Sequence, residues 1–412
     1  MATFFIANLW HDDNRGDAAI AIGTAGLLRA RYPGCHIRFA SVLSDQSGMR
    51  HVRTALPGAD VVPPLVSEMP TGSGWRDHLA LAGWSLRVVL LAVMTLTGHV
   101  PRRLAAAIGD ADAVVLVGGS NLFDTGTGFG VSSVRLLQFA LPGFAAEAMD
   151  RQVWVLGHTL GPFESRIGRR TAARLLRRAD HVVLREEFSM PVARSLGAGH
   201  PVVAADMAFA VDPDLSPRVA RVLVTAGLCP GGFAVLTVRH SPYGGAATDD
   251  RLVAELAATA RGLIADGVVA KVAVVVHTSG PTPVEDDRMM SARVVDAAST
   301  GGQDDVVLVD ADLSPAELAA LYGEARLVIG ERLHSVILAL RAGTPAFAIS
   351  YFTTKAPGVM AACGLPDMQC AVADVTSARL RESARRLCQP EVRGLVRARV
   401  AELRARLHEV VA

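Results

Sequence analysis

The chain has 412 residues, of which half are hydrophobic and a fifth are charged. This composition is typical of a globular protein, and the length favours two domains over one. The net charge of +1 and the lack of a nucleic-acid-binding motif argue against DNA or RNA as a partner. Five cysteines without a C-x-x-C pair predict neither a disulfide framework nor a zinc site.

The chain begins with Met1–Ala7, which lacks the basic start and the cleavage site of a signal peptide and is typical of a strand. We therefore expect a cytoplasmic protein. Strand-like and helix-like runs then alternate, which is typical of parallel sheets with crossover helices. In the first half the expected strands are Thr3–Leu9, His36–Val42, Ala113–Val117, Val153–Gly157, His181–Leu184 and Pro201–Ala204, and the expected helices are Ala18–Arg31, Val134–Met149 and Arg166–Ala179.

The second half repeats this alternation. Its expected strands are Phe233–Val238, Val272–His277, Val306–Val309, Leu327–Ile329 and Ala346–Ile349, and its expected helices are Arg251–Ala265, Pro315–Gly323 and Leu333–Ala342. The weakest periodicity, at Val211–Pro217, predicts the linker. We therefore expect an α/β fold of two doubly wound Rossmann-like domains that face a cleft. The domains would span 1–210 and 218–375, and a helix over 376–412 would pack back onto the first domain.

One apolar segment, Leu79–Val100, interrupts the alternation within the first domain. A membrane-spanning helix needs about 20 consecutive apolar residues, and here Gly83 and Arg87 break the run. The segment therefore favours a core or domain-packing helix first and peripheral membrane contact second.

The strongest chemical signal is Gly330–Ser335, where a short strand ends in glycine and leads into a helix. The N–H groups at a helix start bind anions. Arg332 adds a guanidinium that can hold a carboxylate or phosphate by two bonds, and His334 can move a proton near pH 7. We expect Arg332 and His334 to be catalytic.

Other polar residues follow the predicted strands, where ligands of such sheets bind. Asn14 and Asp17 flank Gly16 in a turn before a helix, and Asp17 is expected to cap that helix. Gly118-Gly119-Ser120-Asn121 would let a ligand approach the backbone. His158 lies between two glycines and is interpreted equally as a cleft residue or as a surface histidine in a tight loop.

Arginines end strands in both predicted domains. A single arginine at the end of a strand usually forms a surface salt bridge. Together with Arg332, however, Arg185 and Arg239 could bind a doubly charged anion. Asp206 could orient a sugar hydroxyl or one of these arginines. Lys355, one of only two lysines, follows the last predicted strand and would reach the same edge. No metal-ligand cluster or cofactor motif occurs, so the sequence indicates anion binding and proton transfer.

Taken in chain order, these motifs resemble those of the polysaccharide pyruvyl transferase family over about residues 8–365. The carriers are Asn14-x-Gly16-Asp17, Gly118-Gly119, Gly157-x-x-x-Gly161-Pro162, Arg185 with Ser189, Asp206-x-Ala208-Phe209, Arg332-Leu333-His334, and Ser350-Tyr351 with Lys355. Two departures are Ser120, where the family often has a third glycine, and His158, where it often has Gln. Both departures concern the substrate more than the reaction type.

The resemblance implies a GT-B-like fold and transfer of the enolpyruvyl unit of phosphoenolpyruvate onto a sugar of a cell-surface glycan. The product would be a pyruvate ketal, with release of phosphate and without a cofactor or metal. Phosphoenolpyruvate and a sugar or glycan acceptor, free or lipid-linked, would be the partners, with the enzyme in the cytoplasm at the inner face of the membrane. The expected substrate-binding residues are Asn14, Asp17, Gly118, Gly119, Ser120, Asn121, His158, Arg185, Asp206, Arg239 and Lys355.

Two alternatives stay open. The same fold could belong to a glycosyltransferase that uses a nucleotide sugar, since a helix start also binds pyrophosphate. It could also belong to a non-catalytic member that binds glycans or anions. Nothing in the sequence indicates an oligomeric state.

Overall fold

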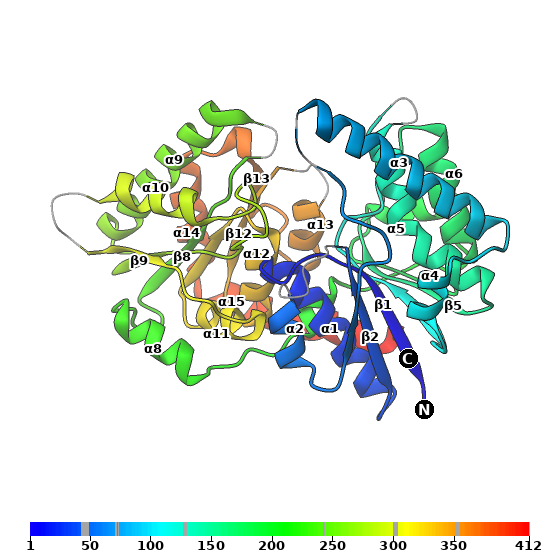
Figure 1. Ribbon diagram of the computed structural model, residues 1–412. Coiled ribbons are helices and arrows are strands. Elements are labelled where there is room, and N and C mark those ends of the chain that lie inside the picture. Colours follow the sequence, from blue (N-terminus) through cyan, green and yellow to red (C-terminus); the bar gives the residue numbers. More distant parts are fainter. Residues whose placement is uncertain are drawn as a thin grey trace. The chain divides into compact units, whose positions relative to one another are not determined.

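The computed structural model describes residues 1–42, 49–70, 72, 74–126, 130–241, 244–299, 304–351 and 355–411. The chain divides into two compact units. Unit 1 consists of Met1–Asp12, Ile20–Met207 and Leu407–Ala412, and unit 2 consists of Asp13–Ala19 and Ala208–Arg406. Each unit contains one parallel sheet with helices on both faces (Figure 1).

Unit 1 is built on a seven-stranded parallel sheet with the order β3-β2-β1-β4-β5-β6-β7. The strands are β1 (Thr3–Leu9), β2 (His36–Ser41), β3 (Asp60–Val62), β4 (Ala113–Leu116), β5 (Gln152–His158), β6 (His181–Leu184) and β7 (Val202–Val203). The helices are α1 (Arg15–Arg31, which begins in unit 2), α2 (Arg50–Ala55), α3 (Trp75–Leu96), α4 (Arg102–Ile108), α5 (Val131–Ala148), α6 (Arg166–Arg178) and α7 (Ser189–Ser195).

Unit 2 is built on a six-stranded parallel sheet with the order β10-β9-β8-β11-β12-β13. The strands are β8 (Phe233–Thr237), β9 (Lys271–Val275), β10 (Val306–Val309), β11 (Leu327–Gly330), β12 (Ala346–Ser350) and β13 (Gln369–Ala371). The helices are α8 (Pro217–Thr225), α9 (Gly245–Ala265), α10 (Arg288–Ala298), α11 (Pro315–Gly323), α12 (Leu333–Arg341), α13 (Lys355–Ala362), α14 (Ser377–Leu387) and α15 (Pro390–Val410).

The central strands of both sheets are buried along their whole length. Every residue of β1, β4, β8 and β11 is buried. Strands covered by helices on both faces are apolar without alternation, which explains the short Val-, Ile- and Leu-rich runs that predicted them. In unit 1, α5 packs on β4 and β5, and in unit 2, α12 packs on β11 and β12. Polar chemistry is therefore concentrated at the strand ends.

The predicted fold class of doubly wound parallel sheets is confirmed, but some elements differ. The edge strands β3 and β13 were not predicted, because each has only three residues. The predicted single helix over 376–412 is wrong: α14 ends at Leu387 and α15 begins at Pro390. Proline cannot donate the backbone hydrogen bond that would continue α14, but it fits the first position of a new helix.

Candidate active site

Each sheet has one point where the order of its strands reverses, between β1 and β4 in unit 1 and between β8 and β11 in unit 2. Ligands of open α/β sheets bind outside the carboxyl ends of the strands at such a point. In unit 2 the residues that follow β8 include Arg239, and those that follow β11 include Glu331, Arg332 and His334. The strongest sequence motif therefore lies at the position where this fold binds ligands.

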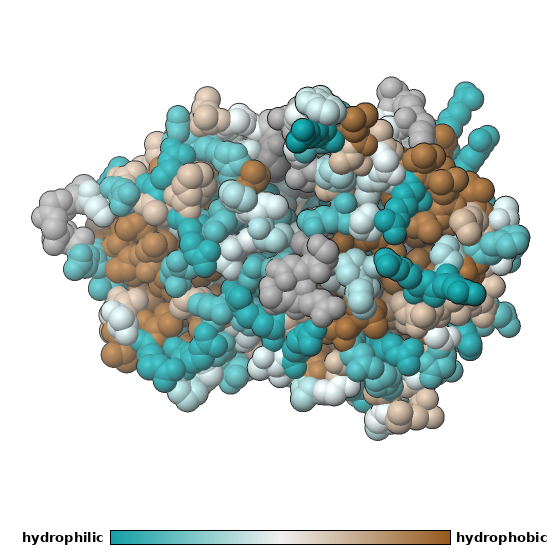
Figure 2. Space-filling model, in the orientation of Figure 1, coloured by the Kyte–Doolittle hydropathy of each residue, from teal (hydrophilic) through white to brown (hydrophobic). Residues whose placement is uncertain are grey.

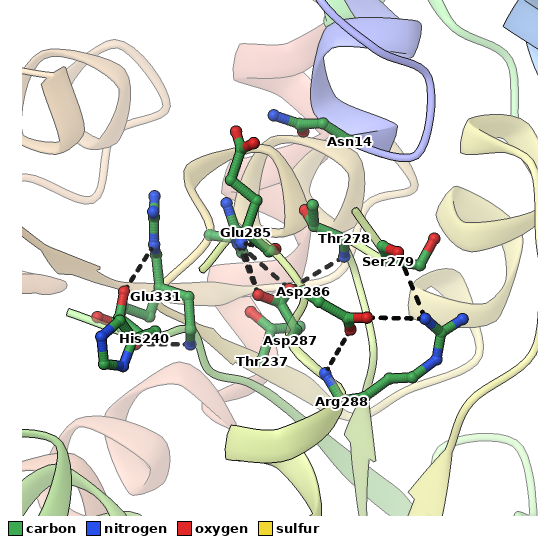
Figure 3. Close-up of polar contacts among 12 residues, drawn as sticks. Asn14, Thr237, His240, Thr278, Ser279, Glu285, Asp286, Asp287, Arg288 and Glu331 are labelled. Carbon is green, nitrogen blue, oxygen red and sulfur yellow. Dashed lines mark hydrogen bonds and ion pairs between the residues drawn. The ribbon is translucent and has the colours of Figure 1, made fainter. Parts of the chain in front are cut away.

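Arg332 is buried and paired with Asp287. Its Nε and Nη2 donate to the Asp287 carboxylate, with the shortest distance 2.6 Å, and Nη2 also donates to the Glu285 carbonyl at 2.6 Å. Asp287 is fully buried and accepts the Thr278 N–H at 3.0 Å (Figure 3). Burial raises the pKa of Asp287, and the Arg332 charge opposes that shift. Arg332 therefore links the β9–α10 loop to the start of α12. Its role in anion binding stays a prediction.

Arg239 has a different environment. Its Nη1 donates to the Tyr351 hydroxyl at 3.0 Å, and its guanidinium carbon lies 4.7 Å from the centre of the Tyr351 ring. Its Nε donates to the His240 carbonyl at 3.2 Å. Among the described residues, no carboxylate pairs with this guanidinium. Arg239 is therefore the arginine of this cluster with a positive charge available to an anionic ligand.

Glu331 is a buried acid at the same strand end, and it was not predicted as a site residue from the sequence. It is 1% exposed, and its Oε2 accepts the backbone N–H of Arg239 at 2.9 Å. Its Oε1 has no hydrogen-bond partner among the described residues. Burial raises the pKa of Glu331 to about 7, against the lowering effects of that hydrogen bond and of Arg239 and Arg332. Glu331 therefore changes charge near neutral pH.

His334 is the second residue of α12 and packs against the first turn of α1. A Cβ atom on Gly16 would lie 2.3 Å from His334 Nδ1, so only glycine permits this approach. Arg15 holds the turn within unit 2, because its Nε donates to the Leu313 carbonyl at 2.9 Å and its Nη2 donates to Asp312 at 2.7 Å. The Gly16 backbone thus fixes one side of the histidine ring.

Asn14, at the start of α1, bonds to the helix that follows it. Its Oδ1 accepts the Gly16 N–H at 3.1 Å, and its Nδ2 donates to Asp17 at 2.6 Å. Asn14 also forms an antiparallel bridge with Thr278, next to the Asp287 cluster (Figure 3). The prediction that Asp17 caps the helix is wrong. Asp17 lies inside the first turn, and the preceding Asn14 supplies the capping oxygen.

A second polar cluster lies in unit 1, centred on Arg185. Its Nη1 donates to Asp206 at 2.9 Å and its Nε donates to Thr159 at 2.7 Å, and both members of the ion pair are buried. A Cβ atom on Gly119 would lie 2.5 Å from Arg185 Nη1, which explains the glycine. Gly118 has a φ of 129°, and its α-carbon faces the Asn121 side chain. Asp206 thus orients an arginine, which was one of its two predicted roles.

His158 is fully buried, so both interpretations that expected it at a cleft or on the surface are wrong. Its Nε2 lies 3.2 Å from the Leu116 carbonyl oxygen. Burial lowers the pKa of His158 to about 4, because the charged imidazolium is unfavourable away from water. The side chain is therefore neutral at pH 7 and contacts the backbone at the end of β4.

The structure sorts the predicted site residues into two groups, one in each unit. Unit 2 contains Asn14, Asp17, Arg239, Arg332, His334 and Lys355, and unit 1 contains Gly118, Gly119, Ser120, Asn121, His158, Arg185 and Asp206. Asn14 and Asp17 were expected in the N-terminal domain, on the acceptor side. Lys355 begins α13, and residues 352–354 of its motif lie outside the described residues.

Three buried polar residues of the unit 2 cluster were not predicted from the sequence: Glu331, Asp287 and His277. Glu331 lies inside the strand–helix motif, and that position was the available signal. Asp287 follows two other acids, Glu285 and Asp286, so the run resembles a solvated loop. His277 Nδ1 lies 3.0 Å from the Tyr322 hydroxyl, and burial lowers its pKa well below the usual range.

Comparison with known proteins gives the family. The family model of polysaccharide pyruvyl transferase matches residues 14–352. The chain is also similar to the amylovoran biosynthesis protein AmsJ of Erwinia amylovora, with 30% identity over 383 residues that cover 86% of this chain and 84% of that protein.

Solved structures share the fold at low sequence identity. S. aureus MnaA with UDP has a TM-score of 0.59 and 13% identity, covering 99% of this chain and 94% of that one. The UDP-GlcNAc 2-epimerase of Neisseria meningitidis has a TM-score of 0.57 and 12% identity, covering 96% and 94%. Glycosyltransferase VinC has a TM-score of 0.52 and 16% identity, covering 99% and 97%. These likenesses confirm the expected GT-B kind of fold, and the matches to the family model and to AmsJ show that the chain belongs to the polysaccharide pyruvyl transferase family.

Proposed function

We propose that this transferase of polysaccharide biosynthesis moves the enolpyruvyl unit of phosphoenolpyruvate onto a sugar and closes it to a pyruvate ketal. Family membership and the biosynthetic relative support the general reaction. The observation that carries the choice of donor is the unit 2 cluster. There, the guanidinium of Arg239 and the helix start that bears His334 follow the two strands at the reversal of the sheet. A small anion with two charged groups suits such a site.

The proposed reaction begins with proton transfer to the methylene carbon of phosphoenolpyruvate. The proton makes that carbon a methyl group and leaves positive charge on the neighbouring carbon. A sugar hydroxyl adds to this carbon. The bond between this carbon and the ester oxygen of the phosphate then breaks, and a second sugar hydroxyl adds to the same carbon and closes the ring. One hydroxyl proton replaces the proton that was transferred, and the other leaves with the phosphate.

We assign the proton transfer to His334, whose imidazole can donate and accept a proton and which lies in the first turn of α12. Arg239 and the N–H groups of that turn would hold the carboxylate and phosphate. Lys355, at the start of α13 in the same unit, would add a second cation. Glu331 would act as a positioning residue, because its Oε2 holds the backbone of Arg239.

We assign the sugar acceptor to unit 1. Ser120 and Asn121 are partly exposed after β4, at the reversal of that sheet. Their hydroxyl and amide groups suit sugar hydroxyls. A glycan precursor in the cytoplasm, free or lipid-linked, would be the acceptor.

Replacement of His334 tests the proposed chemistry. In His334→Ala we expect phosphate release from phosphoenolpyruvate, with a sugar acceptor present, to fall by about 100-fold or more, since a positioned acid–base group contributes about that much. His408→Ala, which changes an exposed histidine on α15, is the matched control. Near-normal turnover in His334→Ala would show that His334 is not the catalytic acid–base group.

A thermal-shift comparison separates this function from nucleotide-sugar transfer, which the shared fold also accommodates. Phosphoenolpyruvate should raise the melting temperature of the protein, and Arg239→Gln should abolish the rise. Stabilisation by a nucleotide diphosphate sugar but not by phosphoenolpyruvate would favour the glycosyltransferase instead.

A further inference from the structure

Helix α3 exposes a continuous apolar face. Trp75, Leu79, Leu86, Leu90 and Val93 are between 52% and 69% exposed. Their spacings of four, seven, four and three residues place them along one side of the helix. In Figure 2 hydrophobic residues gather over the part of unit 1 where Figure 1 draws α3. Large apolar side chains on one face of a helix mark an interaction surface.

The opposite face of α3 is buried within unit 1. Trp84, Val88 and Ala92 are at most 4% exposed, and the helix packs on α5. Trp84 Nε1 also donates to the Ser67 carbonyl at 3.0 Å. The helix has 22 residues and contains an 18-residue stretch with a mean hydropathy of 2.0, so by length and composition alone it could cross a membrane. Its packing requires instead that it lie on the surface of unit 1. The first sequence interpretation, a core or domain-packing helix, accounts for only this buried face.

Positive charge flanks the apolar face. Arg76 and Arg87 on α3 and Arg102 and Arg103 on α4 are exposed. Asp77 is the one acidic residue between 75 and 108. Its carboxylate accepts the Gly74 N–H at 2.9 Å and belongs to the helix start. Two copies of this surface would bring like charges together, whereas anionic headgroups would pair with them.

We propose that α3 docks unit 1 on an anionic lipid surface, with the apolar face among the acyl chains and the arginines at the headgroups. Amphipathic helices of this kind lie in the plane of the interface. Trp75 at one end suits the boundary between headgroup and hydrocarbon. The long aliphatic part of Arg87 lets its charge reach the headgroups from the edge of the apolar face. The proposal goes beyond pyruvyl transfer, because it concerns where the enzyme works.

Sedimentation of the full-length protein with vesicles tests this proposal. Vesicles that contain phosphatidylglycerol should bind the wild-type protein at low salt, and pure phosphatidylcholine vesicles should bind it at least about 10-fold more weakly. Leu86→Glu/Leu90→Glu should lose binding by about 10-fold or more. Val224→Glu, which changes an apolar residue of α8 that is 81% exposed, should bind like the wild type. Arg76→Gln/Arg102→Gln should weaken binding to the anionic vesicles and leave binding to pure phosphatidylcholine vesicles unchanged.

Three results would overturn the proposal. The first is no binding of wild-type protein to anionic vesicles at low salt, and the second is unchanged binding of Leu86→Glu/Leu90→Glu. The third is a wild-type dimer in light scattering that the same double substitution converts to a monomer, which would assign this face to a second copy. Phosphate release with a soluble acceptor should be unchanged in the double variant. Vesicle binding is also measurable in His334→Ala, so failure of the proposed function would not be mistaken for failure of this inference.

Discussion

Gly16 determines how closely the first turn of α1 approaches His334. In Gly16→Ala the new Cβ would lie 2.3 Å from Nδ1, so the ring or the turn must move. Displacement of a catalytic group by about 1 Å costs on the order of 100-fold in rate. We therefore expect kcat/KM for phosphoenolpyruvate to fall by about 100-fold in Gly16→Ala.

The matched control is Gly26→Ala on the same helix, where a Cβ meets nothing within 4 Å. Because alanine favours a helix over glycine, we expect unchanged activity and a stabilisation of about 0.5–1 kcal/mol. Equal activity in the two variants would contradict the role given to Gly16.

The raised pKa of Glu331 should make the free energy of unfolding depend on pH. Folded Glu331 keeps its proton up to about pH 7, whereas a glutamate in the unfolded chain loses its proton near pH 4.5. A raised carboxyl pKa stabilises the fold below 4.5, and this stabilisation is lost as the pH rises to 7. The change amounts to about 3 kcal/mol, at about 1.4 kcal/mol per pH unit. Glu331→Gln removes this titration.

Denaturant unfolding of both proteins between pH 5 and pH 8 measures the effect. The free energy of unfolding of Glu331→Gln minus that of the wild type should rise with pH by up to about 3 kcal/mol. The KM for phosphoenolpyruvate should also rise above pH 7 more steeply in the wild type, since ionised Glu331 adds negative charge beside the anion. A difference in unfolding free energy that is independent of pH would contradict the assignment.

At the scale of elements, the Asp287–Arg332 pair joins the loop before α10 to the start of α12. Both side chains are buried, so Asp287→Asn leaves the Arg332 charge without its counter-ion. Removal of one partner from such a pair costs about 3 kcal/mol or more. We expect a loss of that size in the free energy of unfolding. Asp310→Asn breaks the exposed pair with Arg288 and should cost less than about 1 kcal/mol. Similar losses in the two variants would contradict the structural role of Asp287.

Sequence periodicity located elements whose ends are clearly marked and missed several others. β1, β6, β10 and α11 match their expected bounds, because buried strands and a helix with a Ser314 cap have clear ends. α10 was missed, because its start lies in an acidic run that resembles a loop. The boundary between α14 and α15 was missed although Pro390 marks it, because the Arg-, Ala- and Leu-rich composition is helical on both sides.

The candidate site was predictable only where its residues follow strands directly. Arg239, Arg332 and His334 end or follow central strands, and topology alone brings them to one edge. Sequence cannot show which arginine is neutralised, because the partner Asp287 comes from a loop 45 residues away. Nor does sequence show burial of a polar residue such as His158, which depends on the packing of β4 and β5.

At the scale of the whole molecule, the six-stranded sheet of unit 2 repeats the order of the first six strands of unit 1, and each sheet has its own reversal point. Asp13–Ala19 belongs to unit 2 although it follows β1 of unit 1. The first motif, around Asn14, and the Arg332-Leu333-His334 motif therefore meet in one unit across some 320 residues of sequence. The contact between Gly16 and His334 gives the turn at Asn14–Asp17 a role beyond that of a turn and a helix cap.

The proposed binding of phosphoenolpyruvate by unit 2 and the proposed transfer of its enolpyruvyl unit to a sugar can be tested together. The decisive measurement is mass spectrometry of the products from phosphoenolpyruvate and a panel of hexosides. We predict a cyclic pyruvate adduct on at least one hexoside with the wild-type protein, and at least about 100-fold less with His334→Ala. No adduct on any hexoside, together with transfer of a sugar from a nucleotide donor to the same panel, would contradict pyruvyl transfer.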